Sequence, residues 1–166
     1  MWQYRAEKQT GVEDKMKYKT INELEHFDFK EAYIGQIQML QGSFTMELDN
    51  VTILPENSCN RDIRRMRTNG LVFHITEPTI QLFVEEGYKV YDANGALIRQ
   101  EENRTIAPED YSAACKELED CVIYYIERKE NGYEISIDTE DHTYLIQLAG
   151  TGDREEWDRF MNLDSM

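Results

Sequence analysis

The sequence is constrained most strongly by short runs of alternating apolar and polar residues that are separated by tight turns. The clearest runs lie within residues 121–149, where three of them are divided at Glu130–Gly132 and at Glu140–Asp141. An alternation with a period of two is typical of a β-strand that buries one face. Because a parallel crossover needs a dozen or more residues, strands joined this closely must pair antiparallel.

The same alternation predicts further strands in the first two thirds of the chain. Residues 33–54 form a second meander, and the pair of runs at 88–91 and 96–99 flanks the turn Asp92–Gly95. Its Asn-Gly pair tolerates positive φ at both positions, as a tight hairpin turn requires. The run 121–126 is apolar on both faces, which predicts a central strand.

Three segments have helical patterns instead. Residues 20–28 begin with a capping box, 108–119 begin with a proline suited to the first helical position, and 153–161 carry an apolar stripe after a Gly-Thr-Gly turn. We therefore predict an α+β fold, mainly an antiparallel β-sheet of meanders and hairpins that is curved or barrel-like, with two or three short helices. Residues 20–166 are expected to form one domain, preceded by a flexible or irregular arm at 1–19.

Length and composition suit a single cytoplasmic domain in this interpretation. Its 166 residues are enough to bury a core without disulfides or a metal. The three cysteines, Cys59, Cys115 and Cys121, lack the paired spacing of a disulfide framework. The first residues lack the apolar stretch of a signal peptide, and no run approaches the length of a membrane span.

The charge is strongly negative, with 33 Asp and Glu against 18 Lys and Arg and a net charge of −15. This balance argues against binding to nucleic acid or to an anionic membrane, both of which attract positive surfaces. Three interpretations stay open: solubility, attraction to a basic protein partner, and mimicry of nucleic acid. Self-association is also compatible with the sequence.

No stretch carries a recognisable catalytic, metal or nucleotide motif. The three histidines, His26, His74 and His142, are far apart and have no partner at metal-ligand spacing. Acid pairs such as Glu85–Glu86 and Glu140–Asp141 fall at turns, but adjacent acids arise by chance in so acidic a chain. We predict no cofactor and no metal.

Two groups of residues are the candidate binding sites. Four arginines lie within seven residues of an otherwise acidic chain, and a guanidinium group matches carboxylate or phosphate in a two-pronged contact. The alternative is that these arginines pair with the protein's own acids. Tyrosines on predicted strands could line a groove, or could simply pack across the sheet. The candidate binding residues are Arg61, Arg64, Arg65, Arg67, Tyr88 and Tyr91.

The segment Phe27-Asp-Phe-Lys-Glu-Ala-Tyr-Ile-Gly-Gln-Ile37, with the two alternating strands after it, resembles the start of small cytosolic proteins of Gram-positive bacteria. Some of these uncharacterised families resemble immunity proteins of toxin systems. The resemblance covers about a fifth of the chain and transfers no functional residue. It implies a non-catalytic role in binding a partner.

Three hypotheses about function follow. The first is a non-enzymatic protein-binding domain, immunity-like in neutralising a basic partner. The second is a half-barrel that binds a small molecule, which requires a tyrosine-lined pocket with an arginine at its mouth. The third is a hydrolase without a recognisable motif, which requires His74 or His142 to meet a carboxylate inside a cleft.

Overall fold

A single open sheet of ten strands forms the body of the protein. The computed structural model describes residues 16–40 and 42–163, and neighbouring strands of this sheet run antiparallel throughout. The spatial order is β1 (Tyr18–Ile21), β15 (Gly152–Trp157), β7 (Leu71–Thr76), β4 (Ser43–Asp49), β3 (Tyr33–Leu40), β12 (Val122–Lys129), β13 (Gly132–Asp138), β14 (Thr143–Ala149), β8 (Thr79–Glu85) and β11 (Arg104–Thr105).

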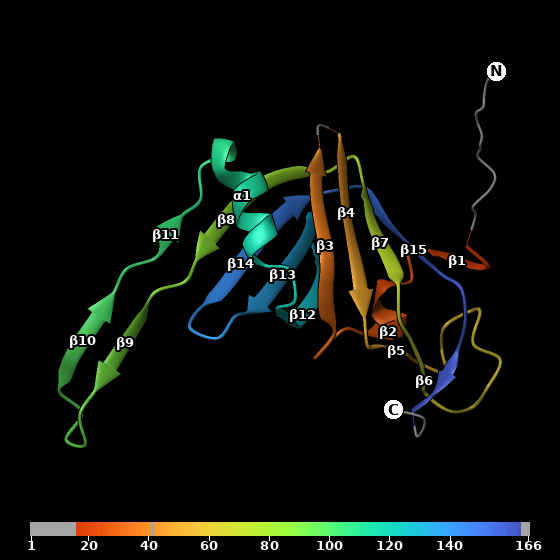
Figure 1. Cartoon of the computed structure of the whole chain (residues 1–166), viewed down its shortest axis with the longest axis horizontal. Helices are drawn as coiled ribbons and strands as arrows, with labels where there is room; N and C mark the ends of the chain where they lie inside the picture. Colours follow the sequence, from red (N-terminus) through yellow and green to blue (C-terminus); the bar gives the residue numbers. More distant parts are fainter. Residues whose placement is uncertain (1–15, 41, 164–166) are drawn as a thin grey trace.

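Two smaller sheets lie at opposite ends of the body (Figure 1). One is a four-stranded sheet in the order β16 (Met161–Asn162), β6 (Met66–Thr68), β5 (Val51–Ile53) and β2 (Phe27–Asp28). The other is a hairpin of β9 (Tyr88–Tyr91) and β10 (Leu97–Glu101), which extends away from everything else. The helical elements are η2 (Leu24–His26), η3 (Pro108–Asp110) and α1 (Tyr111–Glu117).

The core lies where the large sheet bends back on itself. Only one residue pair, Tyr33 with Val122, joins β3 to β12 in the sheet ladder. Across the inner face, however, the ring of Phe73 on β7 lies 6.4 Å from that of Tyr133 on β13. Both side chains are buried, with Trp157 of β15 packed in the same core cluster. The two halves of the sheet are therefore held together both by four backbone hydrogen bonds between residues 31–34 and 120–123 and by side chains that meet between them.

The antiparallel class and most of the predicted hairpins are confirmed, but the third run of the 33–54 meander, β5, pairs with β2 and β6 instead of β4. The strands from 121 to 149 appear as β12, β13 and β14, and β12 lies in the middle of the ten-stranded order as expected. The helix predicted at 108–119 is present as η3 followed by α1, which packs against β3. The sheet does not close, because the outermost strands β1 and β11 are not neighbours.

Two predicted helices are wrong. Residues 153–161 form β15 and the start of β16, and residues 20–28 contain only the short η2 between β1 and β2. In β15 the inward positions are Asp153, Glu155 and Trp157. Because two of these buried residues are acids, the sequence does not show the alternation of apolar and polar residues that predicts a strand. Thr20 does not cap a helix, because its hydroxyl group donates to Glu155 instead.

The N-terminal segment 1–19 was predicted to be a flexible or irregular arm. Residues 1–15 lie outside the described part of the chain, while Tyr18 and Lys19 belong to β1 and pair with β15. Among the described residues, no helix combines the length and the apolar character that crossing a membrane would require.

Two acids are buried side by side on β15. Asp153 accepts a hydrogen bond of 2.7 Å from the Tyr133 hydroxyl group, and Glu155 accepts one of 2.7 Å from Thr20. The other carboxyl oxygens, Asp153 Oδ1 and Glu155 Oε2, have no donor in the described structure. Burial and the adjacent Asp153 carboxyl group raise the pKa of Glu155. We infer that Glu155 keeps its proton and donates it to Asp153.

Because of this pair of acids, we expect the free energy of unfolding to depend on pH. Because folding raises the pKa of Glu155, the folded chain binds one more proton than the unfolded chain once pH exceeds the ordinary value of 4.5. The free energy of unfolding should therefore fall as pH rises between about 5 and 9. Glu155→Gln should flatten this fall and stabilise the fold by about 1–3 kcal/mol at alkaline pH, since an amide can donate to Asp153 without losing a proton.

The measurement is urea unfolding across that pH range for the wild type, Glu155→Gln and the control Glu47→Gln, which changes an exposed residue of β4. An equal pH dependence in the wild type and Glu155→Gln would contradict the shared proton.

Candidate functional site: the β9–β10 arm and its root

The hairpin of β9 and β10, residues 88–101, is called the arm below. Its two strands pair only with each other in the described structure, and Figure 1 shows them extending beyond the body of the protein. Isolated two-stranded hairpins are marginally stable in water because they bury little apolar surface. The arm nevertheless exposes four apolar side chains: Val90 (38%), Tyr91 (55%), Leu97 (48%) and Ile98 (63%).

The tip of the arm is shaped by a turn over Asp92–Ala96. The Asp92 backbone N–H group donates to the Ala96 carbonyl group at 2.9 Å, and the Asp92 carboxylate accepts from the backbone N–H groups of Asn94 and Ala96. Gly95 takes φ = 84°, whereas Asn94 does not have a positive φ. The predicted turn is confirmed, but only one of its two expected left-handed positions is used.

Apolar side chains occupy both faces of the arm. Register pairs Tyr91 with Leu97 and Val90 with Arg99, and partners directly across a ladder share a face. On the face of Val90, the Arg99 guanidinium group donates to the Tyr88 hydroxyl group at 2.6 Å and lies over its ring. This contact shields part of Tyr88 and leaves the other apolar side chains uncovered.

The root of the arm is organised by the Glu85 carboxylate at the end of β8. Arg104 Nε donates to Glu85 Oε1 at 2.7 Å, and the Tyr144 hydroxyl group donates to Oε2 at 3.0 Å. His142 Nε2 lies 3.5 Å from the same Oε2. The hydrogen bond from Arg104 is the largest of the effects that lower the pKa of Glu85. Burial and Glu85 together raise the pKa of Tyr144.

Gly87 lets the two strands of the root pass close together. A Cβ atom at this position would lie 2.0 Å from the Glu101 carbonyl oxygen, which no side chain could accommodate without moving the backbone. The Gly87 N–H group donates to Asn103 Oδ1 at 2.7 Å. The position at which the arm leaves the body therefore requires glycine at residue 87.

A hollow of about 320 Å³ lies beside the root, between β9 and the turn that joins β13 to β14. Both threonine hydroxyl groups in its lining are already used within the turn and strand: that of Thr139 donates to the His142 carbonyl group, and that of Thr143 donates to Asp138. The lining residues are Glu86, Gly87, Tyr88, Thr139, Glu140, Asp141, His142 and Thr143.

The hollow partly meets the requirement of the hydrolase hypothesis, because His142 does approach a carboxylate there. Its lining contains neither cysteine nor serine, and its threonine hydroxyl groups are engaged. His74 instead lies 3.3 Å from Glu156 on the ladder of β7 and β15. Within the described ranges, no cluster of three or more His, Cys, Asp or Glu residues could hold a metal ion.

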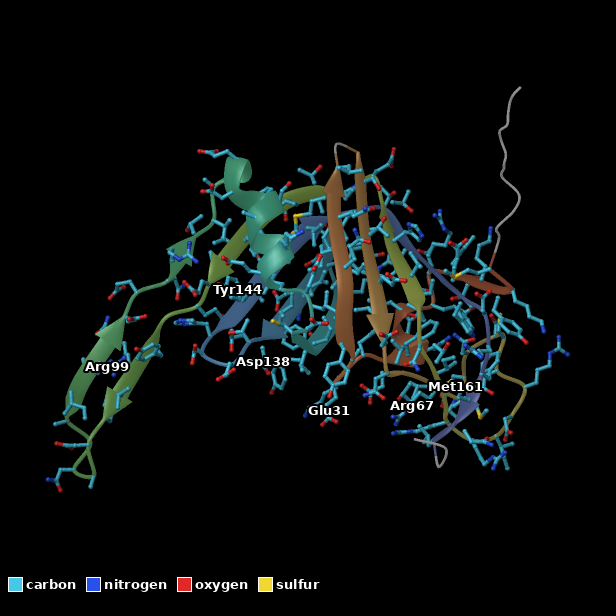
Figure 2. The ribbon with its side chains drawn as sticks, in the orientation of Figure 1. Glu31, Arg67, Arg99, Asp138, Tyr144 and Met161 are labelled. Atoms are coloured by element: carbon cyan, nitrogen blue, oxygen red, sulfur yellow. The ribbon has the colours of Figure 1, made fainter. Side chains whose placement is uncertain are left out.

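The four arginines predicted as a binding cluster do not form one site: Arg64 and Arg65 line one hollow, while Arg61 lines another. Arg64 pairs with Asp62, and Arg67 donates to the Asn50 side chain. The loop is not helical, so Arg61, Arg64 and Arg65 do not share a helical face. Figure 2 shows Arg67 at the far end of the molecule from Arg99, so the predicted tyrosines and arginines form no common site.

Arg61 lines a separate hollow of about 400 Å³ with Tyr18, Met66 and Phe160. The rings of Tyr18 and Phe160 meet edge to face at 4.8 Å and provide an apolar wall. This arrangement places one arginine beside two aromatic side chains, of which one is a tyrosine, whereas the small-molecule hypothesis requires a pocket lined by several tyrosines.

Comparison of the chain with models of known families, with curated proteins and with solved structures gave no match.

Part of this candidate site was predicted from the sequence. Tyr88 and Tyr91 were predicted binding residues, and both lie on the arm. Arg104 and Tyr144 were not connected with Glu85, because they are 19 and 59 residues from it along the chain. No local spacing signals a contact of that kind.

The Glu85 contacts should determine how firmly the root is closed. In Glu85→Gln the ion pair with Arg104 is lost, so the backbone N–H groups of Glu86, Gly87 and Ile106 should exchange with deuterium about two- to fivefold faster. The measurement is residue-resolved hydrogen exchange, with Glu127→Gln on β12 as a matched control. Unchanged exchange at the root would show that backbone pairing alone holds the arm.

Proposed function

We propose that this chain is a protein-binding domain and that the arm is its recognition element. The observation that supports this most directly is the set of exposed apolar side chains on a hairpin that nothing in the described structure covers. Apolar and aromatic side chains of this kind are the usual anchors of protein interfaces. Covering them with a partner would also stabilise a hairpin that is marginal alone.

The form of the arm also supports a protein rather than a small molecule as its ligand. An extended two-stranded sheet with two open edges can contact a partner through its faces and through its backbone. The root supports this use, because Gly87 and the Glu85 contacts hold the arm at a set position. A preorganised arm loses less conformational entropy on binding.

An immunity-like role remains part of this proposal. It is motivated by the resemblance of residues 27–37 to small cytosolic proteins of Gram-positive bacteria, and by the net charge of −15. Such a charge attracts a basic partner over long distances and speeds their association.

A second candidate function is small-molecule binding at the hollow of Tyr18, Arg61 and Phe160. Its apolar wall and its guanidinium group suit a ligand with an apolar body and a carboxylate or phosphate. A thermal-shift screen of anionic metabolites would test it: a stabilised wild type with an unresponsive Arg61→Gln variant supports the site. No response in the wild type counts against it.

The arm predicts a specific effect of one substitution. The bait is the purified full chain, compared as wild type, Ile98→Ser on the arm and Ile63→Ser on the β5–β6 loop, where the isoleucine is 91% exposed. A partner captured from native lysate by the wild type should be retained by Ile63→Ser and reduced at least about fivefold by Ile98→Ser. Quantitative mass spectrometry gives the ratios, and calorimetry with the purified partner confirms them.

Capture that depends on Ile63 and not on Ile98 would place the binding surface on the arginine-rich loop instead. Capture that neither substitution alters would contradict the arm as the recognition element.

A further inference from the structure

The arm leaves one strand position of the large sheet empty. Strand β8 has β14 on one side and β11 on the other. The contact with β14 ends at the root, where Tyr144 pairs with Glu85 and the Glu86 N–H group donates to the Thr143 carbonyl group at 2.8 Å. Beyond that point the chain continues as β9, but β14 does not accompany it (Figure 1). The strip beside β9, in line with β14, is called the open lane below.

The backbone of β9 presents unpaired groups to the open lane. Asp92 donates its N–H group to Ala96, toward β10. Because N–H groups alternate in direction along a strand, those of Tyr91 and Lys89 point away from β10. An edge with free donors and acceptors is a template on which another extended chain can pair. Both residues are exposed, so the edge is accessible.

The inner end of the open lane meets the hollow beside the root. Glu86, Glu140 and Asp141 line this hollow, and no salt bridge within the described residues involves any of the three. Their carboxylates therefore concentrate uncompensated negative charge where a paired strand would end. A Lys or Arg side chain at that end would find charge-assisted partners.

We propose that an extended segment of a basic protein partner pairs with β9 in the open lane and places a cationic side chain in the hollow. This inference rests on the proposed function and adds to it the partner's charge, its backbone conformation and the edge that it occupies. A second copy of this chain is the weaker candidate, because it carries the same net charge of −15 and would be repelled.

The first test uses two synthetic probes and the full chain. Both peptides are ten residues long and have alternating valine and threonine; one ends with two arginines and its twin ends with two glutamates, because a segment antiparallel to β9 has its C-terminal end at the hollow. In NMR titrations at about 0.05 M salt, the arginine peptide should bind at least about tenfold more tightly, and the difference should shrink with added salt. On binding, the N–H groups of Lys89 and Tyr91 should become protected from exchange. Equal affinity of the two peptides would overturn the choice of a basic partner.

The second test changes the hollow and leaves the arm intact. The double variant Glu140→Lys, Asp141→Lys should lose at least about fivefold in affinity for the arginine peptide. The control Glu109→Lys, Glu119→Lys makes the same change in net charge at exposed residues near α1 and should lose less than twofold. Equal losses in the two variants would show that only the total charge matters and would overturn the hollow as the cation site.

The two proposals fail in different ways. Protection that appears on β10, or away from the arm, would overturn the open lane, while loss of partner capture in Ile98→Ser would still support the arm as recognition element. If neither peptide protects Lys89 and Tyr91 and Ile98→Ser captures as the wild type does, both proposals are overturned.

Discussion

The contact between the two halves of the large sheet is the interaction on which the rest of the structure depends. Tyr133 contributes two contacts between the halves: its ring packs near Phe73, and its hydroxyl group donates to the buried Asp153. At the seam between β3 and β12 the ladder contains a single residue pair, and four backbone hydrogen bonds join residues 31–34 to residues 120–123. Burial of the inner faces against each other adds to this pairing and gives the bent sheet its shape. The same contact explains why acids are tolerated inside, since Tyr133 and Thr20 supply donors to Asp153 and Glu155.

The bend also decides where the protein can offer a binding surface. Strands in the bent part of the sheet bury their side chains in the core. Strand β11 is the edge strand and β8 is its neighbour, so the chain can continue outward from both as the arm. At the root, Gly87 allows the two strands to approach closely as they leave the sheet. Glu85 holds this region through its contacts with Arg104, Tyr144 and His142. The stabilising core and the proposed recognition element are thus separated in space, because the core cluster contains no residue of the arm and the arm exposes apolar side chains.

Pattern reasoning succeeded where the buried face of an element is apolar. The hairpins of β12, β13 and β14 were predicted because their inward residues are isoleucines, leucines and tyrosines. It failed at β15, where Asp153 and Glu155 occupy inward positions and imitate the acidic start of a helix. For the candidate site, it named Tyr88 and Tyr91 but grouped Arg61 and Arg67 with Arg64 and Arg65, although only the last two line a common hollow. Proximity along the chain does not imply a common direction of side chains in a non-helical segment.

The sequence by itself determined the antiparallel class, most hairpins, the helix at 108–119 and the strong negative charge, because these depend on residue periodicity, turn residues and composition. Only the tertiary structure decided that the sheet stays open, that two acids share a buried position, and that Glu85 meets partners 19 and 59 residues away. These features depend on which strands become neighbours. That choice is made by the total burial of apolar surface over the whole chain, which no local window of residues contains.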